Sequence, residues 1–200
     1  MTRFLLIRHA LTDTAGKRLV GRMEGVHLNA EGLEQAGHLA LRLSGLKVNA
    51  LYSSPLERAL ETAAPIGKLF HLESIGCNDF IEMDFGEWTN CLIEEIKDQT
   101  GFKQFNSFRS NTRIPGGEMM AEAQLRIISG IEILRRQHDG ETVIIVSHSD
   151  LIKAAICWYA GIHLDLLQRI EVSPASVSIV ELYDETARMV TINNTGELKF

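Results

Sequence analysis

Two histidines follow apolar runs at widely separated places in the sequence, and both could take part in phosphoryl chemistry. Arg8 and His9 follow the apolar run 4–7, and His148 follows the run 143–147. Each run has the length and composition of a buried β-strand. Ligands bind at the carboxyl edge of the strands in an open α/β sheet. Both histidines are therefore expected at that edge, where Arg8 would help them to bind an anion.

His9 is the first candidate for chemistry, because a histidine at a sheet edge can be a nucleophile, a base, a metal ligand or a hydrogen-bond donor. The alternative is a structural histidine whose ring is satisfied by the backbone. The adjacent Arg8 favours a functional role, since a guanidinium can hold phosphate oxygens through two parallel hydrogen bonds. The pair therefore indicates a phosphate site.

Two further residues fall at junctions between a predicted strand and a predicted helix. Arg58 lies in the opening turn of a helix expected after Pro55, and helix amino ends attract phosphate. Its alternative role is a surface ion pair with Glu57 or Glu61, which would contribute little. His148 could donate to the phosphate and stabilise the charge that builds up during transfer, but as a single residue it also fits a structural role.

Phosphoryl transfer from an ester also needs an acid, because the leaving oxygen must receive a proton. The segment 81–88 offers Glu82, Asp84 and Glu87 among aromatic and apolar neighbours. Desolvation in such surroundings can keep a carboxyl group protonated. The spacing does not choose among the three, and each could equally be a solvated loop acid.

The elements that must position these residues follow from the hydrophobic pattern and the turn residues. Strands are predicted at 4–7, 48–52, 71–75 and 142–146, with an antiparallel hairpin at 177–183 and 189–192. Helices are predicted at 29–45, 55–64, 92–96, 118–138 and 150–159, and 102–117 is predicted to be loop that could include helical turns. This alternation predicts an α/β fold, a single-domain three-layer α/β/α architecture with a mostly parallel sheet.

Several local details are also expected. Asn29 should cap its helix, whose inward positions are 33, 36, 40 and 43. Pro55 should occupy the first position of the next helix, and Pro65 should end or kink that helix near Ala64. Ser149 or Asp150 should cap the helix that follows His148.

Composition narrows the class of protein. The 200 residues are 45% hydrophobic, enough for one well-formed core, so one domain covering residues 1–200 is expected. The net charge is −6 and no basic stripe is visible, which argues against a nucleic-acid partner. Because the whole chain repels anions, an anionic ligand must be attracted by local positive charge.

The three cysteines, Cys77, Cys91 and Cys157, show neither metal-type spacing nor an even disulfide set. They are most simply free thiols of a reducing compartment. Residues 1–8 contain only four consecutive apolar residues, too few for a signal peptide's core, and no apolar run approaches the length of a membrane span. The expected location is the cytoplasm, without a membrane partner.

The ordered set of motifs resembles the histidine phosphatase superfamily, which includes the cofactor-dependent phosphoglycerate mutases. The resemblance extends from Phe4 to about Tyr183. One motif alone would be weak, but the ordered set is highly specific. The matching motifs are Leu-Ile-Arg-His at 6–9, Ser-Ser-Pro-Leu-Glu-Arg-Ala at 53–59, Glu-Met-Asp-Phe-Gly-Glu-Trp at 82–88, Pro-Gly-Gly-Glu at 115–118 and Val-Ser-His-Ser at 146–149.

This resemblance implies a phosphoglycerate mutase-like fold and a role for each candidate. His9 would be the nucleophile that forms a phosphohistidine, and Arg8, Arg58 and His148 would complete the phosphate pocket. Glu82 would be the proton donor to the leaving group, a choice that the residues alone left open. The family implies no metal and no cofactor, and the sequence contains no common metal-binding motif.

The chain departs from the family pattern just after the nucleophile. The usual Gly-Glu/Gln is replaced by Ala10-Leu11, whereas Thr12 is retained. Thr12 and Ser149 are expected to contact the phosphate. The departure leaves the nucleophile in place and bears on substrate preference and rate.

The residues after the acid favour the phosphatase branch over the mutases. Mutases of this family carry extra chain and basic residues there, whereas Lys97 is the only basic residue between Glu82 and Gln99. The expected activity is metal-independent phosphomonoester hydrolysis. The alternatives are a phosphoglycerate mutase-type phosphotransferase, a metal hydrolase using His9 and His148, and a catalytically silent phosphate-binding or interaction module.

The rim of the pocket should choose the substrate. Arg22 is the best rim candidate, because glycines flank it in a loop that the family places near the site. The expected partner is a small phosphorylated metabolite, with a phosphoprotein as the less favoured alternative, and the C-terminal hairpin could support a homodimer. Other basic residues of these loops are more simply solvated charges: Lys17, Arg18, Arg109 and Arg113.

Overall fold

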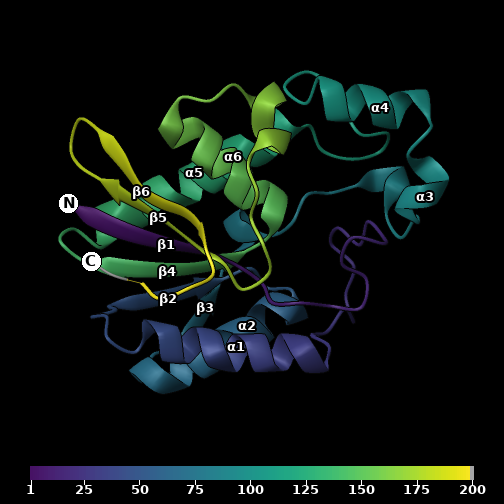
Figure 1. Cartoon of the computed structure of the whole chain (residues 1–200). Coiled ribbons are helices and arrows are strands. Elements are labelled where there is room, and N and C mark those ends of the chain that lie inside the picture. The colour runs from purple at the N-terminus through teal and green to yellow at the C-terminus, as the bar shows by residue number, and fades with distance from the viewer. Residues whose placement is uncertain (199–200) are drawn as a thin grey trace.

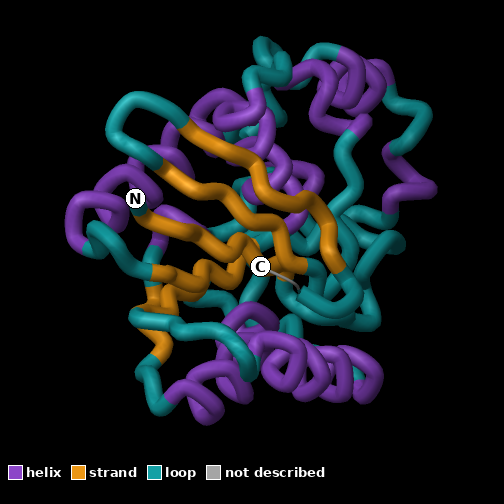
Figure 2. The backbone as a smooth tube through the Cα atoms, turned by 60° about the vertical axis from the view of Figure 1, so that its left-hand side comes forward, coloured by secondary structure: helices purple, strands orange, loops and turns teal. Residues whose placement is uncertain are grey.

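The computed structural model describes residues 1–198, which form a six-stranded sheet between two layers of helices (Figure 1). The strand order is β3-β2-β4-β1-β5-β6, and Figure 2 shows the strands lying side by side. β1 to β4 are mutually parallel, whereas β5 runs antiparallel to β1 and β6 antiparallel to β5. The predicted layered, mostly parallel α/β fold is confirmed. The strands are β1 (Thr2–Arg8), β2 (Ala50–Ser53), β3 (Ser74–Gly76), β4 (Thr142–Ser147), β5 (Val177–Leu182) and β6 (Ala187–Asn194).

Helices cover both faces of the sheet. α1 and α2 pack on one face, whereas α5 and α6 pack on the other, and α3 and α4 extend beyond the carboxyl edge (Figure 1). None of the helices within residues 1–198 combines the length and apolar character that spanning a membrane requires. The helices are α1 (Ala30–Leu43), α2 (Glu57–Phe70), α3 (Ile93–Ile96), α4 (Thr100–Ser107), α5 (Met120–Gln137) and α6 (Ser149–Ala160), with 3₁₀ turns η1 (Asn78–Phe80), η2 (Gly86–Trp88) and η3 (Leu164–Arg169).

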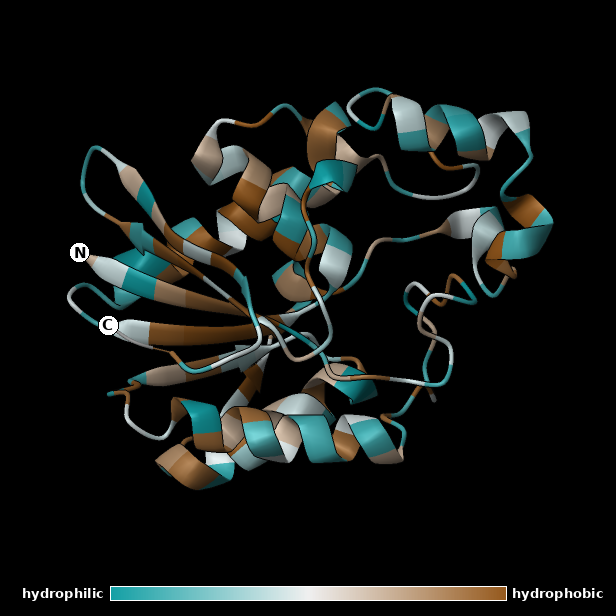
Figure 3. Ribbon diagram, viewed as in Figure 1, coloured by the Kyte–Doolittle hydropathy of each residue, from teal (hydrophilic) through white to brown (hydrophobic). Residues whose placement is uncertain are grey.

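The middle of each central strand, residues 4–7 of β1 and 143–146 of β4, is apolar because both of its faces are covered (Figure 3). Leu5 pairs with Ile144 and faces the α1/α2 core, whereas Leu6 pairs with Ile145 and faces the α5/α6 core. The same register places Arg8 beside Ser147. The residues that follow each strand therefore leave the sheet side by side.

The helix termini confirm one predicted cap and correct another. Asn29 caps α1, because its side chain accepts a hydrogen bond from the Gly32 amide at 2.8 Å. Position 33 of that helix is exposed rather than inward, and Leu39 takes its place in the buried stripe. At α6 the cap residue is His148, with no side-chain cap, so the predicted cap by Ser149 or Asp150 is wrong. The His148 ring instead contacts the Ser54 hydroxyl.

The prediction that Pro55 is the first residue of α2 is also wrong, and the end of the helix predicted as one outcome for Pro65 does not occur. The Ser54 amide still bonds to the Val146 carbonyl at 2.8 Å, so the chain leaves the sheet late and α2 starts at Glu57, two residues after Pro55. Pro65 neither ends nor breaks α2, which continues to Phe70. Ile66, directly after the proline, is fully buried, and this packing outweighs the hydrogen bond that proline cannot donate.

Two segments differ from their predicted secondary structure. The strand predicted at 71–75 shortens to β3, since α2 extends to Phe70 and His71 then turns the chain in a left-handed conformation. Segment 102–117, predicted as loop that could include helical turns, contains most of α4, which buries Phe105 against Trp88. The last two residues of the expected domain, 199–200, lie outside the described part of the chain.

Candidate active site

The candidate catalytic side chains gather at the carboxyl edge of the parallel strands. His9 follows β1, His148 follows β4, and Arg58 lies in the first turn of α2, just beyond β2. The rings of His9 and His148 meet edge to face, with 5.1 Å between their centroids and 61° between their planes. The aligned ends of β1 and β4 thus place the two histidines together.

His9 is held as a neutral ring with one free nitrogen. Its Nδ1 donates a hydrogen bond to the Ala10 carbonyl at 2.7 Å, and because a carbonyl can only accept, Nδ1 carries the proton. Nε2 is left with its lone pair. Burial, followed by the charge of Arg58, lowers the pKa of His9 to about 3. The ring is therefore unprotonated at neutral pH, as a nucleophile must be.

Two guanidinium groups flank this ring, that of the half-buried Arg8 and that of the buried Arg58, and each is fixed by one backbone contact. Arg8 donates from Nη1 to the Val172 carbonyl, and Arg58 donates from Nη2 to the Gly21 carbonyl, both at 2.7 Å. Within residues 1–198, the buried Nε of Arg8 and the buried Nε and Nη1 of Arg58 have no hydrogen-bond partner. Unpaired buried donors are costly unless a ligand satisfies them. Their number and charge suit the oxygens of a phosphate.

His148 is fully buried behind His9. Its Nε2 lies 2.8 Å from Ser54 Oγ, and its Nδ1 lies 3.9 Å from Glu82 Oε2. Burial and the positive charge of Arg58 hold the pKa of His148 well below its usual value, so this ring is also neutral. With the Ser54 hydroxyl donating to Nε2, the Nδ1 proton would be free for an oxygen of the ligand.

Glu82 is the acid that reaches this cluster. It lines the pocket, whereas Asp84 turns back to accept from the Gly86 amide at 2.9 Å and Glu87 is exposed. Burial, followed by the negative charge of Asp150, raises the pKa of Glu82 to about 7. A carboxyl group with that pKa can donate a proton and later accept one near neutral pH.

The backbone of Glu82 is fixed by arginines from other elements. Arg22 donates from Nε to the Glu82 carbonyl at 2.9 Å and pairs through Nη2 with Glu118 at 2.9 Å. Arg126 donates to the Ile81 carbonyl at 2.8 Å and also pairs with Glu118. Arg22 was predicted as a rim residue, but it does not line the pocket. Glu118 and Arg126 were not proposed, although the motif at 115–118 was the available signal.

The pocket has a volume of about 160 Å³ and collects most of the predicted residues. Thr12 and Ser149 lie in its lining, as do three polar residues that the sequence analysis did not place there: Thr14, Arg18 and Asp150. Leu11, one half of the departure from the family motif, is not among the lining residues.

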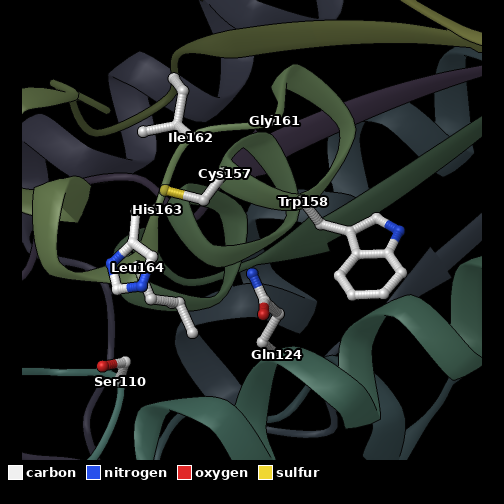
Figure 4. A pocket seen from close by; sticks show the side chains of 8 residues that line it. All are labelled: Ser110, Gln124, Cys157, Trp158, Gly161, Ile162, His163 and Leu164. Carbon is white, nitrogen blue, oxygen red and sulfur yellow. The ribbon is translucent and has the colours of Figure 1, made fainter.

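A second pocket, of about 420 Å³, lies beside the carboxyl-terminal half of α6 (Figure 4). Trp158 and His163 border it, and the Cys157 thiol faces into it. None of the predicted site residues lines this pocket. In the described part of the chain, no group of three or more histidine, cysteine, aspartate or glutamate side chains is arranged to hold a metal ion.

Comparison with known proteins agrees with this geometry. The family model of the histidine phosphatase superfamily (branch 1) matches residues 4–195. Phosphoserine phosphatase 1 of Hydrogenobacter thermophilus is 30% identical, over 99% of this chain and 95% of the relative. The metal-independent phosphoserine phosphatase of Arabidopsis thaliana is 32% identical, over 92% of this chain and 78% of the relative.

A solved structure provides the same match in three dimensions. A phosphoserine phosphatase mutant from Entamoeba histolytica, in complex with phosphoserine, superposes with a TM-score of 0.88 and 25% identity over 98% of both chains. This likeness confirms the predicted phosphoglycerate mutase-like fold and, with the relatives, the predicted phosphatase class. The chain belongs to the histidine phosphatase superfamily.

Proposed function

We propose that the protein hydrolyses small phosphomonoesters in two steps, with His9 as the nucleophile and Glu82 as the acid. In the first step His9 Nε2 forms a bond to phosphorus while the bond from phosphorus to the ester oxygen breaks. Glu82 gives its proton to that oxygen, and the alcohol leaves. The phosphoryl group then resides on His9 with its negative charge facing Arg8 and Arg58.

In the second step water attacks the phosphohistidine on the face that the alcohol has left. The Glu82 carboxylate takes a proton from this water as its oxygen bonds to phosphorus and the bond to Nε2 breaks. Inorganic phosphate is released, and His9 and Glu82 return to their starting states. His148 would donate from Nδ1 to a phosphoryl oxygen in both steps, and Thr12 and Ser149 would contact the remaining oxygens.

The observation that supports this proposal is that the neutral His9 ring and the protonated Glu82 carboxyl share a pocket with two arginines that have unpaired donors. His9 retains a lone pair because burial and Arg58 lower its pKa, while burial keeps Glu82 protonated up to about pH 7. The free donors of Arg8 and Arg58 supply the attraction for a dianion. The chemistry as written needs no metal, which agrees with the name of the Arabidopsis relative.

The substrate we propose is a small phosphorylated metabolite, with phosphoserine as the first to test. The small volume of the pocket favours compact esters. Support also comes from the relatives named phosphoserine phosphatase and from the Entamoeba histolytica enzyme solved with phosphoserine and with 3-phosphoglyceric acid.

The test is phosphate release from a panel of phosphomonoesters in excess chelator. We expect release that survives chelator and disappears in the His9→Asn variant, with a phosphohistidine trapped by rapid acid quench after a radiolabelled substrate is added. Release that chelator abolishes would contradict the mechanism. Transfer of phosphate between positions of phosphoglycerate, without net release, would identify a mutase instead.

The remaining expectations also stand as proposals: one domain over residues 1–200, a cytoplasmic location and a homodimer formed through the β5–β6 hairpin. The three cysteines are free thiols, which supports a reducing compartment.

A further inference from the structure

We infer that Asp150 and Arg18 form a two-point clamp for the ammonium and carboxylate groups of a phosphorylated α-amino acid. This inference rests on the proposed function, because it concerns the part of the ester that lies beyond the phosphate. Both residues line the catalytic pocket together with His9 and Glu82. They carry opposite charges, and neither has a step in the chemistry described above.

Asp150 is held so that one of its oxygens remains available. Arg109 donates from Nη1 to Asp150 Oδ2 at 2.8 Å, and its other amino group bonds to Asn106 at 2.9 Å. Arg109 is itself buried and lies over the Phe105 ring, 4.5 Å from its centroid. Burial would raise the pKa of Asp150, but the adjacent Arg109 keeps it below the usual value. The carboxylate of Asp150, which lines the pocket, is therefore charged, and an ammonium group in the pocket could donate to its Oδ1.

Arg18 is held on the loop that follows the nucleophile. Its Nη1 bonds to both the carbonyl and the side-chain oxygen of Asn90, and its backbone pairs with Leu92. Gly16 adopts a positive φ of 71° in the turn that leads to it. One edge of the guanidinium is thereby fixed, while Nε and Nη2 remain for a carboxylate. Such preorganisation reduces the entropy lost on binding.

The charges of the pocket match those of the proposed ligand. Arg8, Arg58 and Arg18 oppose the single ionised carboxylate of Asp150 when Glu82 is protonated, which leaves two net positive charges in the lining. A phosphate dianion attached to a zwitterionic amino acid carries two net negative charges. An ester with the ammonium alone, or with the carboxylate alone, would leave one arm of the clamp unpaired.

The experiment measures kcat/KM for three esters: phosphoserine, phosphoethanolamine, which has only the ammonium, and 3-phosphoglycerate, which has only the carboxylate. In Asp150→Asn we expect the preference for phosphoserine over 3-phosphoglycerate to fall about tenfold or more, because the charge-assisted bond to the ammonium is lost. In Arg18→Gln we expect the preference for phosphoserine over phosphoethanolamine to fall by a similar factor.

Preference ratios separate the clamp from general damage, since a structural fault or a shift in the pKa of Glu82 changes all three esters together. Matched controls are Asp184→Asn, a fully exposed charge on the β5–β6 hairpin, and Lys17→Gln, an exposed charge beside Arg18. Both should keep the wild-type ratios. The inhibition constant of inorganic phosphate in each variant shows whether the phosphate subsite is intact.

The outcomes distinguish this inference from the proposed function. Wild-type protein that releases no phosphate from any ester contradicts the proposed function. Wild-type hydrolysis with preferences that stay unchanged in both Asp150→Asn and Arg18→Gln overturns the clamp alone. If Asp150→Asn fails to fold because Arg109 loses its buried partner, the ratio in Arg18→Gln still decides between support and rejection.

Discussion

The catalytic pocket has two walls of different construction. The strand wall consists of Arg8, His9 and Arg58, with the buried His148 ring packed behind His9, and these residues end or follow β1, β2 and β4. Backbone hydrogen bonds between paired strands fix its positions. The loop wall comes from the loop 12–20 and the segment 81–88, and side chains such as Arg22 and Arg126 fix it to the rest of the molecule.

Because of this difference, the two walls should differ in how much substitution each accepts without loss of the fold. In the proposed mechanism the strand wall forms and breaks the bond to phosphorus, and its backbone cannot move without moving the core of the sheet. The loop wall carries the acid Glu82 and the candidate specificity residue Arg18. Its geometry depends on a few side-chain contacts, so it can change without loss of the fold. Substitutions in the two walls should therefore have separable effects.

The largest effect is expected in the strand wall. His9→Ala should lower kcat by about a thousandfold or more, because no other group in the pocket replaces the nucleophile. Steady-state phosphate release at saturating phosphoserine measures this, with the melting temperature as a check on folding. Residual activity within tenfold of wild type would mean that another group attacks phosphorus.

The next effect is expected in the loop wall. Glu82→Gln keeps an oxygen for the Met83 amide, which donates to it at 2.8 Å in the wild type, but it removes the acid. We expect kcat to fall about a hundredfold or more for phosphoserine and much less for p-nitrophenyl phosphate, whose leaving group needs no proton. Glu87→Gln, an exposed acid of the same segment, is the control and should match wild type. Equal losses for both esters would argue against an acid role.

The pH dependence of kcat/KM should report the pKa of the same acid, Glu82. Because Glu82 must be protonated for the first step, kcat/KM should fall as the pH rises above its pKa of about 7, by roughly tenfold per unit. Asp150→Asn removes a charge that raises this pKa, so the descending limb should move to lower pH. Measuring both proteins on one substrate cancels the ionisation of the substrate itself. A limb that stays in place in the variant would contradict this coupling.

The smallest effect should come from Arg22, which supports the loop wall without lining the pocket. Arg22→Ala should lower kcat severalfold, since the Glu82 carbonyl loses one of its anchors, and leave KM within about twofold. Michaelis parameters for phosphoserine test this, beside Lys17→Ala as a control on the same loop. A rise in KM with unchanged kcat would instead indicate that Arg22 contacts the substrate at the rim, as the sequence alone predicts.

The strand wall was largely predictable because its signals are local. A continuous apolar run means a strand buried on both faces, and the polar residue that ends such a run must lie at an edge. Leu5–Ile7 and Val143–Val146 carried that signal for His9 and His148. The family resemblance then supplied the role of Glu82, which spacing alone had left equal to its neighbours.

The loop wall and the surroundings of Asp150 were less predictable because their contacts join residues that are distant in the sequence. Arg109 was predicted to be a solvated charge, yet it pairs with Asp150 across 41 positions and is buried. The course of α2 beyond Pro65 likewise depends on packing against the sheet, which no local propensity describes. Tertiary contacts decided these positions.

The register between β1 and β4 has a consequence for folding. Arg8 pairs with Ser147 although more than two-thirds of the chain separates them, and a slip of one residue would turn their neighbours to the opposite faces of the sheet. The catalytic centre therefore cannot form before one of the most non-local contacts of the molecule has closed, a slow kind of event. During refolding, regained activity should report on this long-range pairing and should lag behind the appearance of helix.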